Sequence, residues 1–267
     1  MSSQQPTAHI PEILVFQIKF IHSLALKKRR DSEGLFVAEG PKLVGELWGT
    51  FRCRSLYVED GADLGFVPEG VVPEYVSHVL MERATLLTTP HCVLAVFEKP
   101  EDEEADNVSA VAESELCLAL DDIQNPGNLV TIIRTADWMG IRRVFCSRGT
   151  ADLYSPKVLQ ATMGSAARVK VSYTDLPAAL KTCNAPVWGT FLDGENIFGA
   201  PLEPRGVIVI GNEGNGISKE VEQTVTRRLF IPPYPEGRTT VESLNAGIAT
   251  AITLAAFRGR MYNEKTK

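Results

Sequence analysis

The chain has 267 residues, of which 44% are hydrophobic, and a formal net charge of -6 at pH 7. No apolar run approaches the roughly 20 residues of a membrane span, and residues 1–6 lack the charged-then-apolar order of a signal peptide. These features argue against membrane-spanning helices and predict a cytoplasmic protein with one large or two modest domains. The five cysteines include no C-x-x-C pair, which indicates buried free thiols rather than a metal site or a disulfide framework.

The negative charge is concentrated in one segment. Residues 101–115 contain seven acidic side chains and no basic one, and the rest of the chain has 27 basic residues against 26 (33 minus 7) acidic ones. The stretch 98–107 has no periodic apolar residues, so it predicts a solvated linker. We therefore divide the chain into four parts: a disordered N-terminus at 1–12, a domain at 13–99, an acidic linker at 100–114, and a domain at 115–262.

The part before the linker alternates helical and extended patterns. Apolar residues at helical spacing predict a helix from about residue 14, and Pro41 suits the first turn of a helix that ends near Trp48. Extended runs at 35–38, 55–58 and 93–97 complete a small α/β domain. Three basic clusters, Lys27 to Arg30, Arg142-Arg143 with Arg148, and Arg227-Arg228, each fit a wetted face or an RNA contact, and ordinary surface composition favours the wetted face.

The part after the linker repeats the alternation more regularly. Strands are expected at residues 116–120, 143–146, 169–171, 187–192, 207–210 and 229–231, and helices at 128–139, 156–163, 176–183, 219–227 and 244–259. This pattern predicts a parallel sheet with helices on both faces and ligands at the carboxyl ends of its strands. Polar, glycine-rich segments follow four of these strands, at 121–128, 193–195, 211–218 and 232–242.

Residues 211–218 form the most informative of these segments, with three glycines among the first six positions. The first and last glycine have the spacing of a phosphate-binding P-loop, but Ile217 stands where that loop has its lysine. Lys219 likewise replaces the third glycine of a dinucleotide fingerprint. Because Glu213 would also repel a polyphosphate, a generic nucleotide-binding enzyme is disfavoured and we expect another ligand.

All four histidines precede the linker, so the second domain cannot use a histidine base or histidine-bound zinc, and we expect no metal. Arg134 is the first candidate for chemistry because it follows Asn128 by six residues on an otherwise apolar helix. That spacing places its guanidinium close to the buried side of the helix. A structural ion pair with Asp121, Asp122 or Asp137 explains it equally well.

Two further polar residues have ordinary interpretations when they are taken alone. Glu213 could cap backbone amides of its own loop as readily as act as a functional acid. Ser243 is most simply the N-cap of the last helix.

Three motifs, taken together and in this order, resemble those of the SpoU (TrmH) family of RNA ribose 2'-O-methyltransferases, which belongs to the SPOUT superfamily. They are NPGNLVTIIRTA at 125–136, IVIGNEGNGIS at 208–218, and IP at 231–232 with SLNAGIA at 243–249. The similarity covers about residues 116–260. In addition, LFVAEGPKLV at 35–44 resembles the substrate-binding domain of many members, a small α/β fold like that of certain RNA-binding ribosomal proteins.

The resemblance implies a SPOUT domain, a parallel sheet whose C-terminal segment passes through a loop in a deep trefoil knot. It implies that S-adenosylmethionine binds in this knot and that the chain forms a homodimer through the C-terminal domain, with the active site completed across the interface. The matching cofactor positions are Thr190, Phe191, Leu192, Ile210, Gly211, Asn212, Gly216, Ile231, Pro232, Ser243 and Leu244. The matching catalytic positions are Asn128, Arg134, Glu213, Ser243 and Asn245.

The resemblance leaves the role of Arg134 open between two mechanisms. The family's arginine has been assigned as the base that deprotonates the ribose 2'-hydroxyl. Because arginine stays protonated in proteins, we favour a second role, in which Arg134 gathers the substrate phosphate and steadies the developing alkoxide. Asn128 and Glu213 would then position the guanidinium.

Structured ribosomal RNA is the expected substrate, because a substrate-binding domain of this kind accompanies the ribosomal members of the family. Transfer RNA is the alternative substrate, and a non-catalytic RNA-binding or ribosome-assembly factor on the same scaffold is the second hypothesis. The stretch 233–242 is longer than the commonest family pattern and could reshape the mouth of the site.

Overall fold

A computed structural model describes residues 12–66, 68–100, 108–235, 238 and 243–265. The chain divides into two compact units, residues 1–99 with 154–160, and residues 100–153 with 161–267. Except for residue 12, the segment expected to be a disordered N-terminus lies outside the described residues, as do the acidic positions 101–107. Residues 108–114 of the expected linker form helix α5 (Val108–Ser114), which buries Val108 and Ala112.

The first unit contains a four-stranded sheet in the order β1-β4-β2-β3. Strand β4 pairs antiparallel with both β1 and β2, and β3 pairs parallel with β2. The strands are β1 (Leu35–Glu39), β2 (Cys53–Glu59), β3 (Glu74–Val76) and β4 (Val93–Glu98). The helices are α1 (Glu12–Ser23), α2 (Lys27–Glu33), α3 (Pro41–Leu47), α4 (His78–Ala84) and α7 (Pro156–Ala161). The sequence did not predict α2, β3 and α4, because they are too short to show an apolar period.

Both faces of this sheet are covered. On one face, Ile21 and Leu24 pack into a buried cluster with Val37. On the other face, the neighbouring residue Phe36 stacks on Phe97 with ring centroids 5.6 Å apart, and the Tyr154 ring lies 4.8 Å from Phe36. Because alternate residues of β1 point to opposite faces, its four-residue apolar run can serve both cores.

The second unit contains a six-stranded sheet in the order β10-β8-β9-β5-β6-β7, in which every neighbouring pair is parallel. The strands are β5 (Leu116–Leu120), β6 (Arg143–Ser147), β7 (Lys170–Thr174), β8 (Val187–Asn196), β9 (Gly206–Ile210) and β10 (Arg227–Phe230). All six predicted strands are present, so the predicted parallel sheet is confirmed. One predicted helix is too long, since α10 (Lys219–Glu222) stops well before residue 227, which begins β10.

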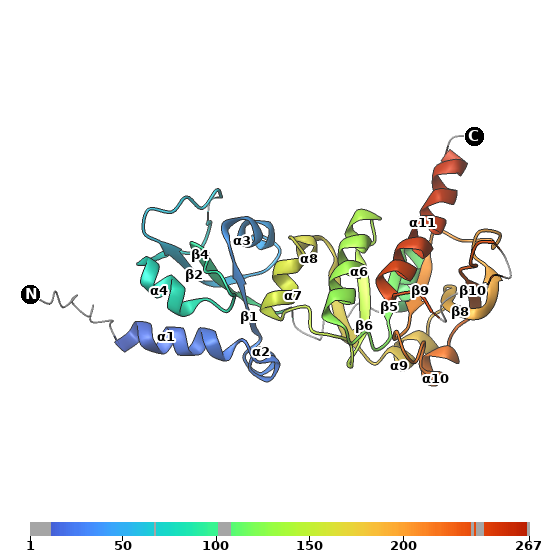
Figure 1. Cartoon of the computed structure of the whole chain (residues 1–267), viewed down its shortest axis with the longest axis horizontal. Helices are drawn as coiled ribbons and strands as arrows, with labels where there is room; N and C mark the ends of the chain where they lie inside the picture. Colours follow the sequence, from blue (N-terminus) through green and yellow to red (C-terminus); the bar gives the residue numbers. More distant parts are fainter. Residues whose placement is uncertain (1–11, 67, 101–107, 236–237, 239–242, 266–267) are drawn as a thin grey trace, which may run out of the picture. The chain divides into compact units, whose positions relative to one another are not determined.

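Helices cover both faces of this sheet, and α6 and α11 lie side by side on one of them (Figure 1). The remaining helices of the unit are α6 (Pro126–Trp138), α8 (Ser165–Arg168), α9 (Leu176–Lys181) and α11 (Ala246–Lys265). Cys117 and Ala119 of β5 belong to a core cluster with Leu176 of α9. On the opposite face, Trp188 of β8 meets Phe257 of α11 edge to face, with centroids 5.4 Å apart.

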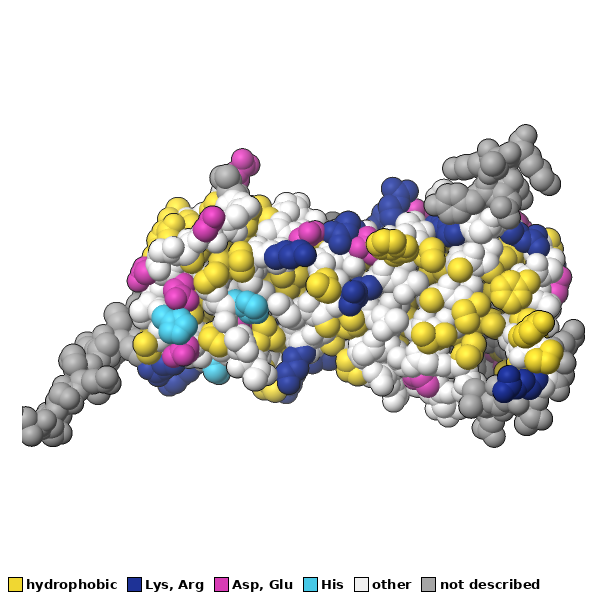
Figure 2. Space-filling model, turned by 45° about the horizontal axis from the view of Figure 1, so that its top comes forward, with side chains coloured by type: hydrophobic (Ala, Val, Ile, Leu, Met, Phe, Trp, Pro, Cys, Tyr) yellow, Lys and Arg dark blue, Asp and Glu magenta, His cyan; other side chains and the backbone are white. Residues whose placement is uncertain are grey.

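The surface of the second unit carries large apolar side chains. Trp138 at the end of α6 is 87% exposed, and Ile248 in the first turn of α11 is 51% exposed. Leu244, just before α11, is also exposed. Figure 2 shows hydrophobic side chains gathered on the face of this unit that it presents. The apolar surface at the start of α11 is therefore partly open to solvent.

The topology brings four loops together. Strands β10, β8, β9 and β5 are neighbours and run parallel, so their carboxyl ends lie along the same edge of the sheet. The segments expected to bind ligands follow these ends. The trefoil knot stays a prediction, and most of the long stretch 233–242 lies outside the described residues. Among the helices described, none is both long and apolar enough to cross a membrane.

Candidate active site

The glycine-rich loop after β9 is a closed turn. Backbone bonds of 2.9 Å run in both directions between Asn212 and Gly216. The Asn212 Oδ1 atom accepts from the backbone N–H groups of Gly214 and Asn215 at 2.9 and 3.0 Å. A Cβ atom on Gly211 would lie 2.3 Å from the Gly216 carbonyl carbon, so only glycine fits there. The loop is thus held in one shape by its own side chain and its glycines.

Two contacts fasten this loop to the segment that follows β5. The buried Asp121 accepts a hydrogen bond at Oδ2 from the Ser218 N–H at 2.7 Å. Asn212 Nδ2 donates to the Asp122 carbonyl oxygen at 2.8 Å. Because the loop after β5 leads directly into α6, these bonds fix the glycine-rich loop relative to the start of that helix.

Asn128 receives contacts from two other motifs. Asn125 caps α6 by accepting from the backbone N–H groups of Gly127 and Asn128. The Asn128 side chain, 8% exposed, donates from Nδ2 to the Glu213 carboxylate. Its Oδ1 accepts from Asn245 Nδ2 at 2.8 Å. Three of the predicted catalytic residues, Asn128, Glu213 and Asn245, therefore form one hydrogen-bonded group.

The prediction that Ser243 caps the last helix is wrong. Asn245 is the cap, since its Oδ1 accepts from the N–H groups of Gly247 at 3.0 Å and Ile248 at 3.3 Å. Ser243 is exposed and lies two residues farther from the helix. The start of α11 is pressed against α6, because a Cβ on Gly247 would lie 2.8 Å from the Thr131 methyl carbon.

The spacing predicted that Arg134 lies close to the buried side of α6. In the structure its side chain is exposed instead. Six residues at about 100° each turn it roughly 120° away from the buried Asn128. The alternative of a structural ion pair is also wrong. Asp137 binds Arg168 at 3.0 Å and Asp121 binds the Ser218 amide. In the part of the chain that the structure describes, Arg134 makes no hydrogen bond or ion pair.

Strand β8 is interrupted where the resemblance places cofactor residues. Arg228 of β10 lies opposite Gly189, but the next residue of β10, Leu229, lies opposite Glu195. Residues 190–194 therefore bulge out of the sheet, and this bulge contains Thr190, Phe191 and Leu192. Gly194 closes it, since a Cβ there would lie 2.4 Å from the Leu229 carbonyl carbon. The sequence pattern at 187–192 predicts a plain strand, and it has no signal for the bulge.

The other predicted cofactor positions lie at the same edge of the sheet. Ile210 is the buried last residue of β9, while Ile231 and Pro232 follow β10 and are half-buried. Ser243 and Leu244 are exposed just before α11. That these residues contact the cofactor stays a prediction. The glycine-rich loop presents backbone groups and one carboxylate but no basic side chain, a donor set that suits a nucleoside with a sulfonium better than a phosphate.

Sequence reasoning missed two residues that shape this edge. Asp121 was noted only as a possible partner of Arg134, although it holds the glycine-rich loop. Arg228 was noted only as part of a basic cluster, although it contacts the bulge. Neither contact had a local signal, because Ser218 is far from Asp121 in the sequence and the bulge is far from Arg228. Among the described residues, no group of His, Cys, Asp and Glu could hold a metal ion.

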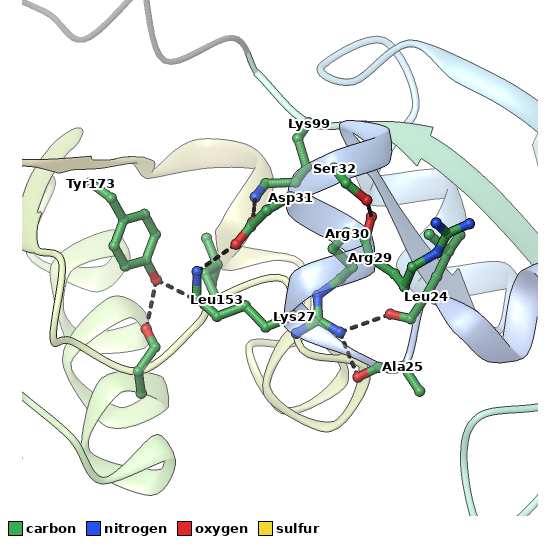
Figure 3. A network of polar contacts seen from close by, with 11 residues as sticks. Leu24, Ala25, Lys27, Arg29, Arg30, Asp31, Ser32, Lys99, Leu153 and Tyr173 are labelled. Carbon is green, nitrogen blue, oxygen red and sulfur yellow. Dashed lines mark hydrogen bonds and ion pairs between the residues drawn. The ribbon is translucent and has the colours of Figure 1, made fainter.

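The basic cluster on α2 is only partly exposed to solvent. Arg30 is 2% exposed and donates to the carbonyl oxygens of Leu24 and Ala25 at 2.7 Å each, so it holds the preceding turn together. Lys27 and Lys99 both reach Asp31, at 2.7 and 2.5 Å (Figure 3). Two ammonium groups on one carboxylate leave this surface positive.

Fold and site together define an α/β protein with a parallel sheet and a ligand site at its carboxyl edge. Two family models match the chain: SpoU rRNA Methylase family over residues 115–255, and MRM3-like substrate binding domain over residues 16–95. The chain therefore belongs to the SpoU rRNA methylase family. This confirms the resemblance recognised in its three motifs.

Similar proteins cover nearly the whole chain. The 23S rRNA (guanosine(2553)-2'-O)-methyltransferase RlmP of Bacillus subtilis is 30% identical over 91% of this chain and 96% of its own length. Among solved structures, a TrmH-family protein from Porphyromonas gingivalis has 39% identity and a TM-score of 0.83, covering 95% of this chain and all of the other. An AdoMet-bound rRNA methyltransferase from Sinorhizobium meliloti has 27% identity and a TM-score of 0.77, covering 92% and 95%.

Proposed function

We propose that this chain methylates a ribose 2'-hydroxyl of ribosomal RNA with S-adenosylmethionine as the methyl donor. The observation that carries the proposal is the bonded group of Asn128, Glu213 and Asn245, which joins all three family motifs at one edge of the sheet. The names of its relatives as rRNA 2'-O-methyltransferases support the same reaction and the same class of substrate.

S-adenosylmethionine, when bound, supplies an electrophilic methyl group on a sulfonium sulfur. The bulge at 190–194, the loop after β9 and the segments 231–232 and 243–244 would hold it, chiefly by backbone groups. Gly211 and Gly194 allow the tight backbone packing that these loops need. A loop without a lysine fits this ligand, which carries no phosphate.

Arg134 would meet the RNA. Its exposed guanidinium, without a partner among the described residues, is available for a substrate phosphate and for the charge that develops on the attacking oxygen. The bonds that Asn128 makes to Glu213 and Asn245 keep the polar edge beside the start of the same helix in one arrangement. In this proposal Arg134 acts by charge and geometry, and the proton passes to solvent.

The first unit would bind RNA through the surface of α2. Lys28 is exposed there, Lys27 and Lys99 share one carboxylate, and Arg29 pairs with Glu33 at 3.0 Å. Helix α2 with Lys99 carries five basic and two acidic side chains, and buried Arg30 keeps the helix in place. Phosphate contacts need such a positive surface, whatever the sequence of the RNA.

A second copy of the chain would cover the exposed apolar residues of α6 and α11. Trp138 and Ile248 are too large and too exposed for an ordinary solvated face. Arg134 is one helical turn before Trp138, so a partner seated on Trp138 would come close to the catalytic edge. Trp138→Glu should shift the protein toward monomer in light scattering, while Lys181→Glu, on the exposed surface of α9, should leave the dimer intact.

Methyl transfer is the direct test of the proposed function. The purified protein and radiolabelled S-adenosylmethionine are incubated with ribosomal or transfer RNA from cells that lack the gene, and 2'-O-methyl sites are mapped in both. Labelling of one ribosomal nucleotide is the expected result. Labelling of transfer RNA alone would favour the alternative substrate, and RNA binding without cofactor binding would favour an assembly factor. The knot and a cytoplasmic location stay predictions.

A further inference from the structure

Arg228 contacts three residues at the edge of the sheet. Its Nη2 atom lies 2.5 Å from Asp193 Oδ1, and its Nη1 atom lies 2.6 Å from Glu222 Oε1 on α10. The guanidinium carbon lies 3.6 Å from the centroid of the Phe191 ring. One side chain therefore stacks on an aromatic ring and binds two carboxylates.

Two of these contacts lie on the bulge of β8. Phe191 and Asp193 flank Leu192, whose side chain is 74% exposed. The Phe191 ring also packs against the core, and a Cβ on Gly189 would lie 2.5 Å from it. The far end of the bulge is fixed where Gly194 meets β10. Arg228 thus holds both sides of the turn at 191–193, which otherwise lies outside the sheet ladder.

We infer that Arg228 is a positioning residue, which holds residues 190–192 in the shape that binds the methyl donor and so sets cofactor affinity. This inference rests on the proposed function. In this inference Arg228 contacts neither the methyl donor nor the ribose and acts only through Phe191 and Asp193. Its effect should therefore appear in cofactor binding rather than in the methyl-transfer step.

The chemistry of the Arg228 side chain supports a role in fixing the shape of the bulge rather than in the global stability of the unit. Exposed ion pairs add little to folding, so the two carboxylate contacts alone would not stabilise the unit much. A planar guanidinium can stack and bind two carboxylates at once, which an ammonium cannot do. Holding a binding loop in its bound shape raises affinity by reducing the cost of ordering it. The hydrogen bond from Arg228 lowers the pKa of Asp193, so the pair stays ionised at neutral pH.

The test compares Arg228→Gln and Arg228→Lys with Arg227→Gln. Arg227 is the adjacent, exposed residue of β10, so the control removes the same charge without touching the bulge. For Arg228→Gln we expect the Kd for S-adenosylmethionine in calorimetry and its KM to rise about tenfold, with kcat within about twofold of wild type. For Arg228→Lys we expect a Kd and a KM between those of wild type and Arg228→Gln. For Arg227→Gln both values should match wild type.

A second variant separates shape from loss of folding. Asp193→Asn keeps the stacking of Arg228 on Phe191 but removes one ion pair, and it should raise the same Kd by a smaller factor. Unchanged cofactor affinity in Arg228→Gln, or a lower kcat at unchanged KM, would overturn the inference while the proposed function stands. A wild-type protein that binds no S-adenosylmethionine would overturn both.

Discussion

Asn245 Nδ2 donates a hydrogen bond of 2.8 Å to Asn128 Oδ1, although the two residues are 117 positions apart. The bond joins the beginnings of α11 and α6. Because Asn128 also donates to Glu213, its amide has a fixed orientation, with the oxygen toward Asn245 and the nitrogen toward the carboxylate. A side chain that can only accept should therefore fail at this position.

Replacing Asn128 with Asp tests that orientation. The substitution removes the donor to Glu213 and places two carboxylates in contact, so methyl transfer should fall on the order of tenfold to a hundredfold, the cost of one charge-assisted hydrogen bond. Single-turnover rates measure the loss. Asn215→Asp makes the same change on the exposed part of the glycine-rich loop and should keep near-normal rates. Equal activity of the two variants would contradict the role of the bonded group.

Replacing Arg134 with Lys separates its two possible roles. A lysine keeps the positive charge but loses the planar, two-pronged geometry, so we expect kcat to fall roughly tenfold with RNA affinity little changed. Steady-state kinetics and RNA-binding titrations give both numbers. Near-full turnover would argue for simple charge. Complete loss of turnover with intact RNA binding would favour Arg134 as the base that deprotonates the 2'-hydroxyl, and it would count against our mechanism.

Gly211 should tolerate no side chain. In Gly211→Ala the new Cβ would lie 2.3 Å from the Gly216 carbonyl carbon, which forces the loop open. We expect cofactor binding to be lost and the melting temperature to fall. In Gly214→Ala the nearest atom, Asn212 Oδ1, is 3.5 Å away, an ordinary contact. Calorimetry on both variants decides the point, since similar affinities would show that the closed turn is not needed.

Lys28 should contribute to RNA binding through charge alone. Lys28→Glu should weaken binding of all RNA sequences alike and reduce the slope of log K against log salt by about 1. Fluorescence titrations between low and physiological salt measure the slope. Lys181→Glu reverses a charge on the second unit and serves as the control. An unchanged slope in Lys28→Glu would exclude α2 from the RNA contact.

Burial raises the pKa of the Cys53 thiol to about 11. The same cause raises the pKa of the thiols of Cys117 and Cys146. An unfolded thiol ionises near about 8.5, so the folded state binds more protons above that pH. The free energy of unfolding should therefore be unaffected by these thiols below about pH 8.5 and should decrease as the pH rises toward 11. Urea unfolding of wild type and Cys53→Ser should show a smaller decline in the variant, and a decline of equal size would contradict the assignment.

Much of the fold could be predicted because its signals are local. The apolar run before Gly211 reads as a buried strand, and the strand and helix patterns alternate often enough to require a parallel sheet. The absence of a lysine at position 217 is also visible in the sequence alone. The same local logic fails where an element is very short, as for α2, or where one strand changes partner register, as at residues 190–194.

The capping of α11 shows the same limit at the scale of single residues. A serine before a helical pattern is a good N-cap, and by sequence Ser243 fits that position. The structure uses Asn245, whose side chain can cap the helix and reach Asn128 at the same time. Arg30 is a similar case, since its burial depends on the carbonyl groups of the preceding turn.

By itself, then, the amino-acid sequence determined the class of fold, the kind of ligand that the glycine-rich loop excludes, and the motifs of the family. Only the tertiary structure decided that Asn128, Glu213 and Asn245 share one set of hydrogen bonds, that Arg134 is exposed, and that Arg228 contacts the bulge of β8. The reason is physical. Periodicity and turn chemistry act between neighbours in the chain, whereas these contacts depend on strand register and helix rotation, which are settled only when distant segments pack.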